Sequence, residues 1–235
     1  MKSIILKISE YKEKDAVVTA LNEEGLISFL VKGLRGAKSK HMALNNPLVV
    51  ADLTFLENSS YKYKVLKEAD VLFSPLNLMG NLRELALVML LANLINEMLQ
   101  DEELLVVFQY ILSSIEDIYK NKRVNENVLY LIFKFLNVTG YNLTVSSCVK
   151  CGSKNEIVNF SFKEGGFLCR NCNEKERIIA SGKDLLKLRS LVNKQNNVFD
   201  FEPLDNDVFD SILKELLLFI EDNFGIKIKN KDILI

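Results

Sequence analysis

The sequence predicts an α+β protein with three parts: an amino-terminal β-barrel, an α-helical domain and a small cysteine-containing ribbon inserted into that domain. Three observations support this prediction. Residues 1–72 contain five short apolar or alternating runs, whereas the longer runs after Pro75 and Gly80 have helical periodicity. Between the helical runs, two Cys-x-x-Cys pairs flank a short hairpin pattern. With 49% hydrophobic residues, the chain is too apolar to be disordered.

The five predicted strands fit a small closed barrel. The second run contains the β-branched residues Val17, Val18 and Thr19, and Gly25 closes the turn before the third run. The fourth and fifth runs alternate between two sets of side chains, as half-buried strands do. The OB-fold is the commonest such barrel, and an SH3-like barrel is the alternative that the strand pattern leaves open. The predicted strands are residues 4–8, 16–21, 26–31, 48–57 and 61–66.

Five helices are predicted after the barrel. The first is apolar nearly all round, which indicates a buried helix, and its most apolar stretch is too short to span a bilayer. Ser181 with Asp184 resembles a capping box for the fourth helix. Asp205 is placed to cap the fifth helix, and Gly225 is placed to end it. The predicted helices are residues 81–99, 101–115, 125–140, 181–192 and 205–224.

These elements give a domain division and a location. Residues 1–76 form the predicted barrel, residues 77–147 and 178–235 the helical domain, and residues 148–177 the ribbon. The start of the chain has no secretory signal pattern, because Lys7 soon interrupts its short apolar run. We therefore expect a cytoplasmic protein with no membrane contact, associated with the nucleoid if it binds DNA.

The cysteines predict one structural zinc ion. Cys148 and Cys151 form one Cys-x-x-Cys pair, and Cys169 and Cys172 form the second after seventeen residues. Each pair presents two sulfurs to one metal, and two facing pairs give tetrahedral coordination with no open position for a catalytic water. Two disulfides are the first alternative, which a reducing compartment disfavours. A redox pair and an iron–sulfur cluster are the others.

Charge and motif content argue against an enzyme. The chain has 30 Lys and Arg residues against 31 Asp and Glu residues, so nucleic-acid contact has to come from a local basic patch. His41 is the only histidine, and no Ser-His-Asp set or tight carboxylate cluster is visible. A Walker A loop ending at Ser39 would need glycines where the chain has Lys32 and Ala37.

The loop after the third strand is a candidate phosphate-binding segment. Residues 32–41 contain cations and no acids, and a mobile basic loop can follow a nucleic-acid backbone without reading its sequence. A solvated connector is the alternative. Tyr61 and Tyr63 alternate with lysines and could add base stacking, with ordinary strand packing as their alternative. The candidate DNA-binding residues are Lys32, Arg35, Lys38, Ser39, Lys40, Lys62 and Lys64.

At this point the sequence resembles a known family. The spacing of Tyr11, Asp15, Val18, Leu21 and the Glu24-Gly25 pair, followed by Val31-Lys32-Gly33, Arg35 and Ser39, resembles the amino-terminal barrel of the bacterial recombination mediator RecO. Lys12 stands where most members have glycine, whereas Glu13 fits the pattern. The apolar helices and the cysteine ribbon with its Gly165-Gly166 turn follow in the family order, so the resemblance covers essentially the whole chain.

The resemblance implies a non-enzymatic function in DNA repair. It implies binding to single- and double-stranded DNA, annealing of complementary strands, partnership with RecR and contact with the acidic C-terminal tail of the single-strand binding protein. Together these activities would help to load RecA at gaps. Lys32, Arg35 and Ser39 match the family's loop, whereas the other four candidate residues are chosen on charge. A protein-interaction adaptor and an RNA-binding OB-fold protein are the alternative functions.

Overall fold

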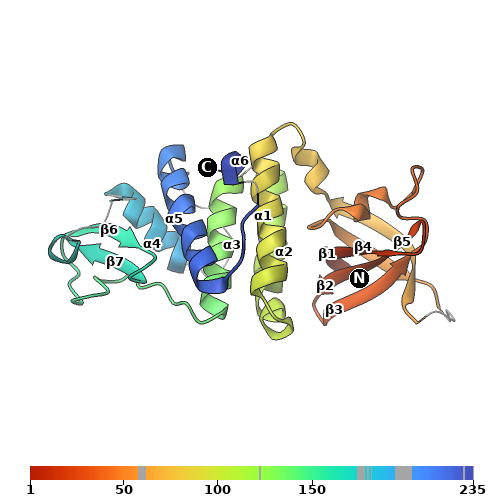
Figure 1. Cartoon of the computed structure of the whole chain (residues 1–235), viewed down its shortest axis with the longest axis horizontal. Helices are drawn as coiled ribbons and strands as arrows, with labels where there is room; N and C mark the ends of the chain where they lie inside the picture. The colour runs from red at the N-terminus through yellow and green to blue at the C-terminus, as the bar shows by residue number, and fades with distance from the viewer. Residues whose placement is uncertain are drawn as a thin grey trace.

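The computed structural model confirms the predicted α+β fold. Figure 1 shows an elongated molecule with the barrel at one end, the cysteine ribbon at the other and a layer of helices between them. The structure describes residues 1–57, 62–121, 123–173, 178, 180, 182–193, 203–229 and 231–234.

The barrel has OB-fold topology. Its strands follow the order β1-β2-β3-β5-β4, and antiparallel pairing of β1 with β4 closes it. The second and third strands form the predicted hairpin, whereas β3 and β5 pair in parallel over a short stretch. This order excludes the SH3-like alternative, whose strands follow one another as an antiparallel meander. The strands are β1 (Lys2–Tyr11), β2 (Asp15–Asn22), β3 (Gly25–Val31), β4 (Val50–Phe55) and β5 (Lys64–Phe73).

Strand β4 shows how alternation builds the barrel. Val49, Ala51 and Leu53 lie in the barrel core, as predicted from their spacing, and Val50 points the other way into the helical core. Strand β5 differs from its prediction because it begins at Lys64, where it pairs with β3, and continues to Phe73, paired with β4 from Leu66 onward. The predicted start of this strand at Tyr61 lies outside the described residues.

The five predicted helices are present, and α2 continues to Asn121, past its predicted end at residue 115. The Asn81 side chain accepts a hydrogen bond from the Glu84 N–H and begins α1. Asp205 caps α5 in the same way, and Gly225 ends α5 in the left-handed conformation at φ 68°, as predicted. The predicted cap Ser181 lies outside the described residues. The α-helices are α1 (Leu82–Met98), α2 (Asp101–Asn121), α3 (Val124–Val138), α4 (Lys183–Asn193), α5 (Asn206–Phe224) and α6 (Lys231–Leu234). The 3₁₀ helices are η1 (Met42–Asn45), η2 (Pro75–Leu78) and η3 (Arg170–Cys172).

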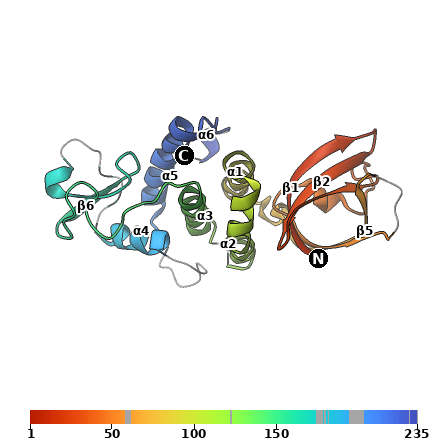
Figure 2. The ribbon, with the colours of Figure 1, turned by 90° about the horizontal axis from the view of Figure 1, so that it is seen from below.

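The barrel and the helices share one hydrophobic core. Ile4 and Leu21, on the outer face of the barrel, belong to the same buried cluster as Leu91 of α1 and Phe108 of α2. The Asn96 side-chain amide of α1 also donates a hydrogen bond of 3.3 Å to the Leu6 carbonyl oxygen of β1. Figure 2 shows α1 and α2 lying between the barrel and the remaining helices. The barrel is therefore packed directly on the helical layer.

The carboxyl-terminal segment folds back over the helices. Glu221 of α5 accepts a hydrogen bond of 3.1 Å from the Ile228 N–H and pairs with Lys231, and these two groups lower the pKa of the Glu221 carboxyl. Arg83 of α1 pairs with Asp210 of α5. Arg83 also donates a hydrogen bond of 3.5 Å to the Leu234 carbonyl oxygen, which joins α6 to α1 at the edge of the helical layer. Within the described residues, no helix is both long enough and apolar enough to cross a membrane.

The ribbon consists of β6 (Ile157–Ser161) and β7 (Gly166–Cys169) and packs on the helices at its aromatic end. Phe160 and Phe167 are buried in the helical core, and the Phe162 ring lies 6.1 Å from that of Phe219 in α5. On the linker between α3 and the ribbon, the Thr144 carbonyl oxygen accepts a hydrogen bond of 2.9 Å from the Phe167 N–H. The ribbon is thus fixed to the helical domain at one end and carries the cysteines at the other.

Candidate metal centre and nucleic-acid interface

The four cysteines meet at one point of the ribbon. Their sulfur atoms all lie within 4.8 Å of one another, and the Cys151 and Cys169 sulfurs are 3.6 Å apart. A tetrahedron with metal–sulfur bonds of about 2.3 Å has sulfurs about 3.8 Å apart, so this arrangement can bind one metal ion. All four cysteines are free, which rules out the alternative of two disulfides in this structure.

Local backbone geometry presents the sulfurs. The Gly152 N–H donates to the Cys148 carbonyl oxygen at 2.8 Å, and the Asn173 N–H donates to the Cys169 carbonyl oxygen at 3.0 Å. Each bond closes a tight turn around one Cys-x-x-Cys pair. Gly152 adopts φ 74°, a left-handed conformation in which glycine avoids the strain of a side chain.

The thiols differ in their electrostatic surroundings. Burial raises the pKa of the Cys148 thiol, but hydrogen bonds from the backbone of Cys169 and Cys151 outweigh that effect and hold the pKa at about 6. Side-chain hydrogen bonds with Cys169 and Cys151 raise the pKa of the Cys172 thiol to about 12. Four thiolates this close repel one another, so a divalent cation is the natural means of keeping all four ionised.

The basic loop is tied to the turn between β1 and β2. The Gly33 N–H donates a hydrogen bond of 2.8 Å to the Asp15 carboxylate, and the Arg35 N–H donates one of 3.0 Å to the Lys14 carbonyl oxygen. The Arg35 guanidinium also lies 2.6 Å from the Glu10 carboxylate at the end of β1. The first half of the loop is therefore anchored to the barrel.

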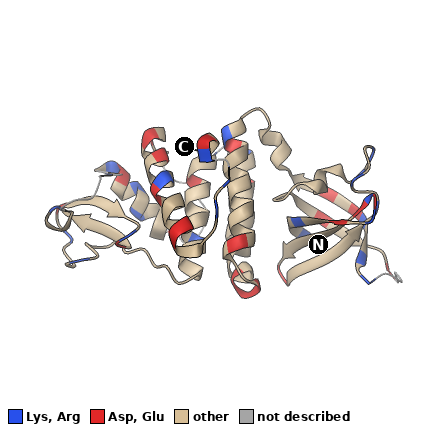
Figure 3. Cartoon of the chain, viewed as in Figure 1, with Lys and Arg blue, Asp and Glu red and all other residues tan. Residues whose placement is uncertain are grey.

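The predicted loop cations fall into two groups. Lys32, Arg35, Lys38 and Lys40 are all exposed, and Arg35 forms an ion pair with Glu10. Among the residues that the structure describes, Lys38 and Lys40 make no ion pair. The fifth candidate of this loop, Ser39, is half-buried and accepts a hydrogen bond of 3.3 Å from the His41 N–H. In Figure 3, lysine and arginine segments mark the loop tips at the barrel end farthest from the helices.

The other two predicted lysines lie against aromatic rings. The Lys62 amine lies 5.8 Å from the centre of the Tyr63 ring, and the Lys64 amine lies 5.8 Å from that of Phe55. The structure also brings the Tyr11 ring to 6.3 Å from the Tyr63 ring, a pairing that sequence reasoning missed. The only sequence signal for this pairing was that a lysine follows each tyrosine, after Tyr11 at the end of β1 and after Tyr63 at the start of β5. The predicted partner Tyr61 lies outside the described residues.

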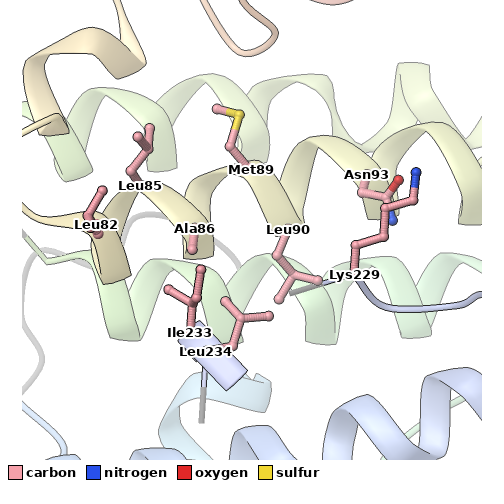
Figure 4. Close-up of a pocket in the computed structure, with 9 residues that line it drawn as sticks. All are labelled: Leu82, Leu85, Ala86, Met89, Leu90, Asn93, Lys229, Ile233 and Leu234. Atoms are coloured by element: carbon pink, nitrogen blue, oxygen red, sulfur yellow. The ribbon is translucent and has the colours of Figure 1, made fainter. Parts of the chain in front are cut away.

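An apolar pocket opens between α1 and the carboxyl-terminal segment. Its volume is about 400 Å³. The Lys229 amine stands at one end of this pocket, as Figure 4 shows. Leu82 and Ile233, which line its opposite end, are 73% and 47% exposed, so a partner could still cover them. The lining residues are Leu82, Leu85, Ala86, Met89, Leu90, Asn93, Lys229, Ile233 and Leu234.

Comparison with known proteins gives consistent matches along the chain. The family model described as recombination protein O N terminal matches residues 1–75, and the one described as recombination protein O C terminal matches residues 79–232. The chain is similar to the DNA repair protein RecO of Acetivibrio thermocellus, with 30% identity over 220 residues, covering 91% of this chain and 85% of the relative. It is also 25% identical to DNA repair protein RecO of Bacillus subtilis, covering 99% of this chain and 92% of the relative.

Proposed function

This chain belongs to the RecO family of DNA repair proteins, and from that premise we propose that it binds single- and double-stranded DNA through its barrel and anneals complementary strands. The observation that carries the proposal is the loop of the OB-fold that is anchored at Gly33 and Arg35 and carries the exposed residues Lys38 and Lys40. Cations there offset phosphate charge and lower the repulsion between two strands that approach each other. Base pairing and stacking then supply the free energy, so the protein needs neither ATP nor a catalytic residue.

The proposed metal is one zinc ion with a structural role. Zinc favours four thiolate ligands, and the sulfur separations fit its tetrahedral geometry. Cys148, Cys151, Cys169 and Cys172 would hold the ion, which would supply the positive charge that keeps the ribbon folded. The ribbon (residues 148–177) would act as a unit inserted in the helical domain (residues 77–147 and 178–235), beside the barrel (residues 1–76).

The proposed partners are those of a recombination mediator in the cytoplasm, at the nucleoid. We propose RecR as one partner of this chain and the acidic C-terminal tail of the single-strand binding protein as a second. Together these contacts would help to load RecA on DNA that is coated by the single-strand binding protein. The pocket beside Lys229 supports the contact with the tail, because apolar walls and a cation at one end suit a peptide that is acidic and partly apolar.

The pocket contact predicts a charge-reversal effect. Lys229→Glu should weaken binding of a fluorescent peptide with the tail sequence by about 10-fold, because an attraction becomes a repulsion at the pocket entrance. Fluorescence anisotropy measures the affinity. Lys214→Glu, an equal change at an exposed position of α5, should leave the affinity unchanged. Equal affinities for the two variants would mean that the tail does not bind at this pocket.

The DNA-binding proposal is tested by removing the loop charges. Replacing Lys32, Arg35, Lys38 and Lys40 with alanine should weaken binding to a single-stranded oligonucleotide by about 100-fold at low salt. Log affinity decreases with log salt, and the steepness of that decrease should become smaller by at most about 3, because each lost phosphate contact removes roughly 0.7 from the slope. Filter binding or anisotropy across a salt series gives both quantities. Arg35 should contribute least, since its charge is already offset by Glu10.

The matched control removes four charges far from the barrel. Lys154, Lys163, Lys183 and Lys214 are exposed on the ribbon and the helical domain, and their replacement with alanine should change neither affinity nor slope. Unchanged binding in the loop variant would refute the loop assignment. Failure of the unaltered protein to bind DNA at low salt would favour the adaptor function, and preference for RNA in competition would favour the RNA-binding alternative.

A further inference from the structure

Two tyrosines form an aromatic pair on the outer surface of the barrel. The Tyr11 and Tyr63 rings meet edge to face, with centres 6.3 Å apart and an angle of 81° between their planes. Both rings are half-buried, and neither belongs to a hydrophobic cluster of the described chain. The pair is therefore fixed in position without being part of the core.

Each ring of this pair has a lysine beside it. The Lys12 amine lies 5.6 Å from the centre of the Tyr11 ring, and the Lys62 amine lies 5.8 Å from that of Tyr63. Contacts of this kind at an exposed site are weak, so a ligand can replace them. Aromatic rings with cations close by are the two features that single-stranded nucleic acid requires of a binding surface.

The pair lies beside the basic loop. Tyr11 ends β1 and is the cross-strand partner of Asp15 in β2, so the two side chains lie on the same face of the sheet. The Asp15 carboxylate and the carbonyl oxygen of Lys14, in the turn before it, anchor the loop backbone. A strand whose phosphates contact the loop cations would thus have its bases within reach of the two rings.

From this arrangement we propose that Tyr11 and Tyr63 stack on unpaired bases and make the barrel favour single strands over duplex. The idea rests on the proposed DNA binding and adds a base-contacting element to it. Duplex bases already stack on each other and cannot reach a tyrosine, whereas unpaired bases can do so at little cost. Stacking involves no phosphate, so it adds affinity without adding salt dependence.

An abasic oligonucleotide tests the proposal, because it keeps the phosphate charge and lacks the bases. The unaltered protein should bind a normal strand about 10-fold more tightly than an abasic strand of equal length. In the Tyr11→Leu/Tyr63→Leu double variant that preference should disappear. Affinity for duplex and the salt slope should stay unchanged. Anisotropy measurements on the three DNA forms give all these values.

The controls separate stacking from damage to the fold. Tyr11→Phe/Tyr63→Phe keeps both rings and should retain the preference for bases, and Tyr141→Leu alters an aromatic residue of the helical domain and should also retain it. A leucine double variant that still prefers the normal strand would overturn the inference. So would an unaltered protein that binds both strands equally well, although DNA binding itself would then stand. Binding to neither strand would overturn the proposed function together with the inference.

Discussion

Replacing Cys148 with serine should abolish metal binding and unfold the ribbon while the barrel and the helices stay folded. Serine has no thiolate, and the three remaining sulfurs cannot complete a tetrahedral site. Structural zinc contributes about 10–16 kcal/mol in isolated zinc-finger peptides, more than a unit of two short strands can gather from its own core. The cluster around the sulfurs is small, with Cys148, Leu168 and Cys169 as its buried members.

Native mass spectrometry and hydrogen exchange measure this expected loss. The unaltered protein should carry one zinc ion per chain, and the variant none. Amide exchange should accelerate across the ribbon strands and remain slow in α1 and α3, whose burial does not depend on the metal. Ser146→Ala changes an exposed residue two positions earlier and should keep both the metal and the protection. Full metal content in the Cys148 variant would contradict the assigned ligand set.

Local patterns account for the parts of the structure that the sequence predicts. The Cys-x-x-Cys pairs specify the metal centre because each pair folds within a few residues. The helix ends at Asn81 and Gly225 depend on one side chain or one backbone conformation, which can be read from residue type. The alternation in β4 is visible because its two faces carry different sets of side chains.

Contacts between distant residues account for what the sequence does not show. In β1, Ile4 is buried against the helices and Ile5 is buried inside the barrel, so the strand does not alternate between polar and apolar residues. The Tyr11–Tyr63 pair joins residues 52 positions apart through the closure of the barrel. The fold likewise brings the Glu10 carboxylate to Arg35, where it offsets the charge of the guanidinium. A count of loop cations therefore overstates the charge that the loop presents.

Replacing Gly166 with alanine should destabilise the junction between the ribbon and the helical domain by about 3 kcal/mol or more. An added Cβ would lie 2.1 Å from the Thr144 carbonyl oxygen and 2.9 Å from the Thr144 nitrogen, and these are backbone atoms that no side-chain rotation can move. The Thr144 carbonyl oxygen accepts the hydrogen bond from the Phe167 N–H, and the Thr144 N–H donates to the Gly165 carbonyl oxygen at 2.8 Å. To relieve the clash, the linker at Thr144 must move away from the ribbon, which exposes the polar backbone groups of both segments.

Gly165→Ala is the matched control because it adds the same methyl group one residue earlier. Gly165 has φ 83°, so alanine there pays the strain of a left-handed conformation, about 1 kcal/mol, but its Cβ would meet no atom within 4 Å. Urea unfolding followed by circular dichroism should show a clearly larger loss for Gly166→Ala than for Gly165→Ala. Hydrogen exchange should place that loss at the Phe167 amide and the linker, with zinc retained. Equal losses in the two variants would mean that the linker can move aside, and that Thr144 does not fix the ribbon to the helices.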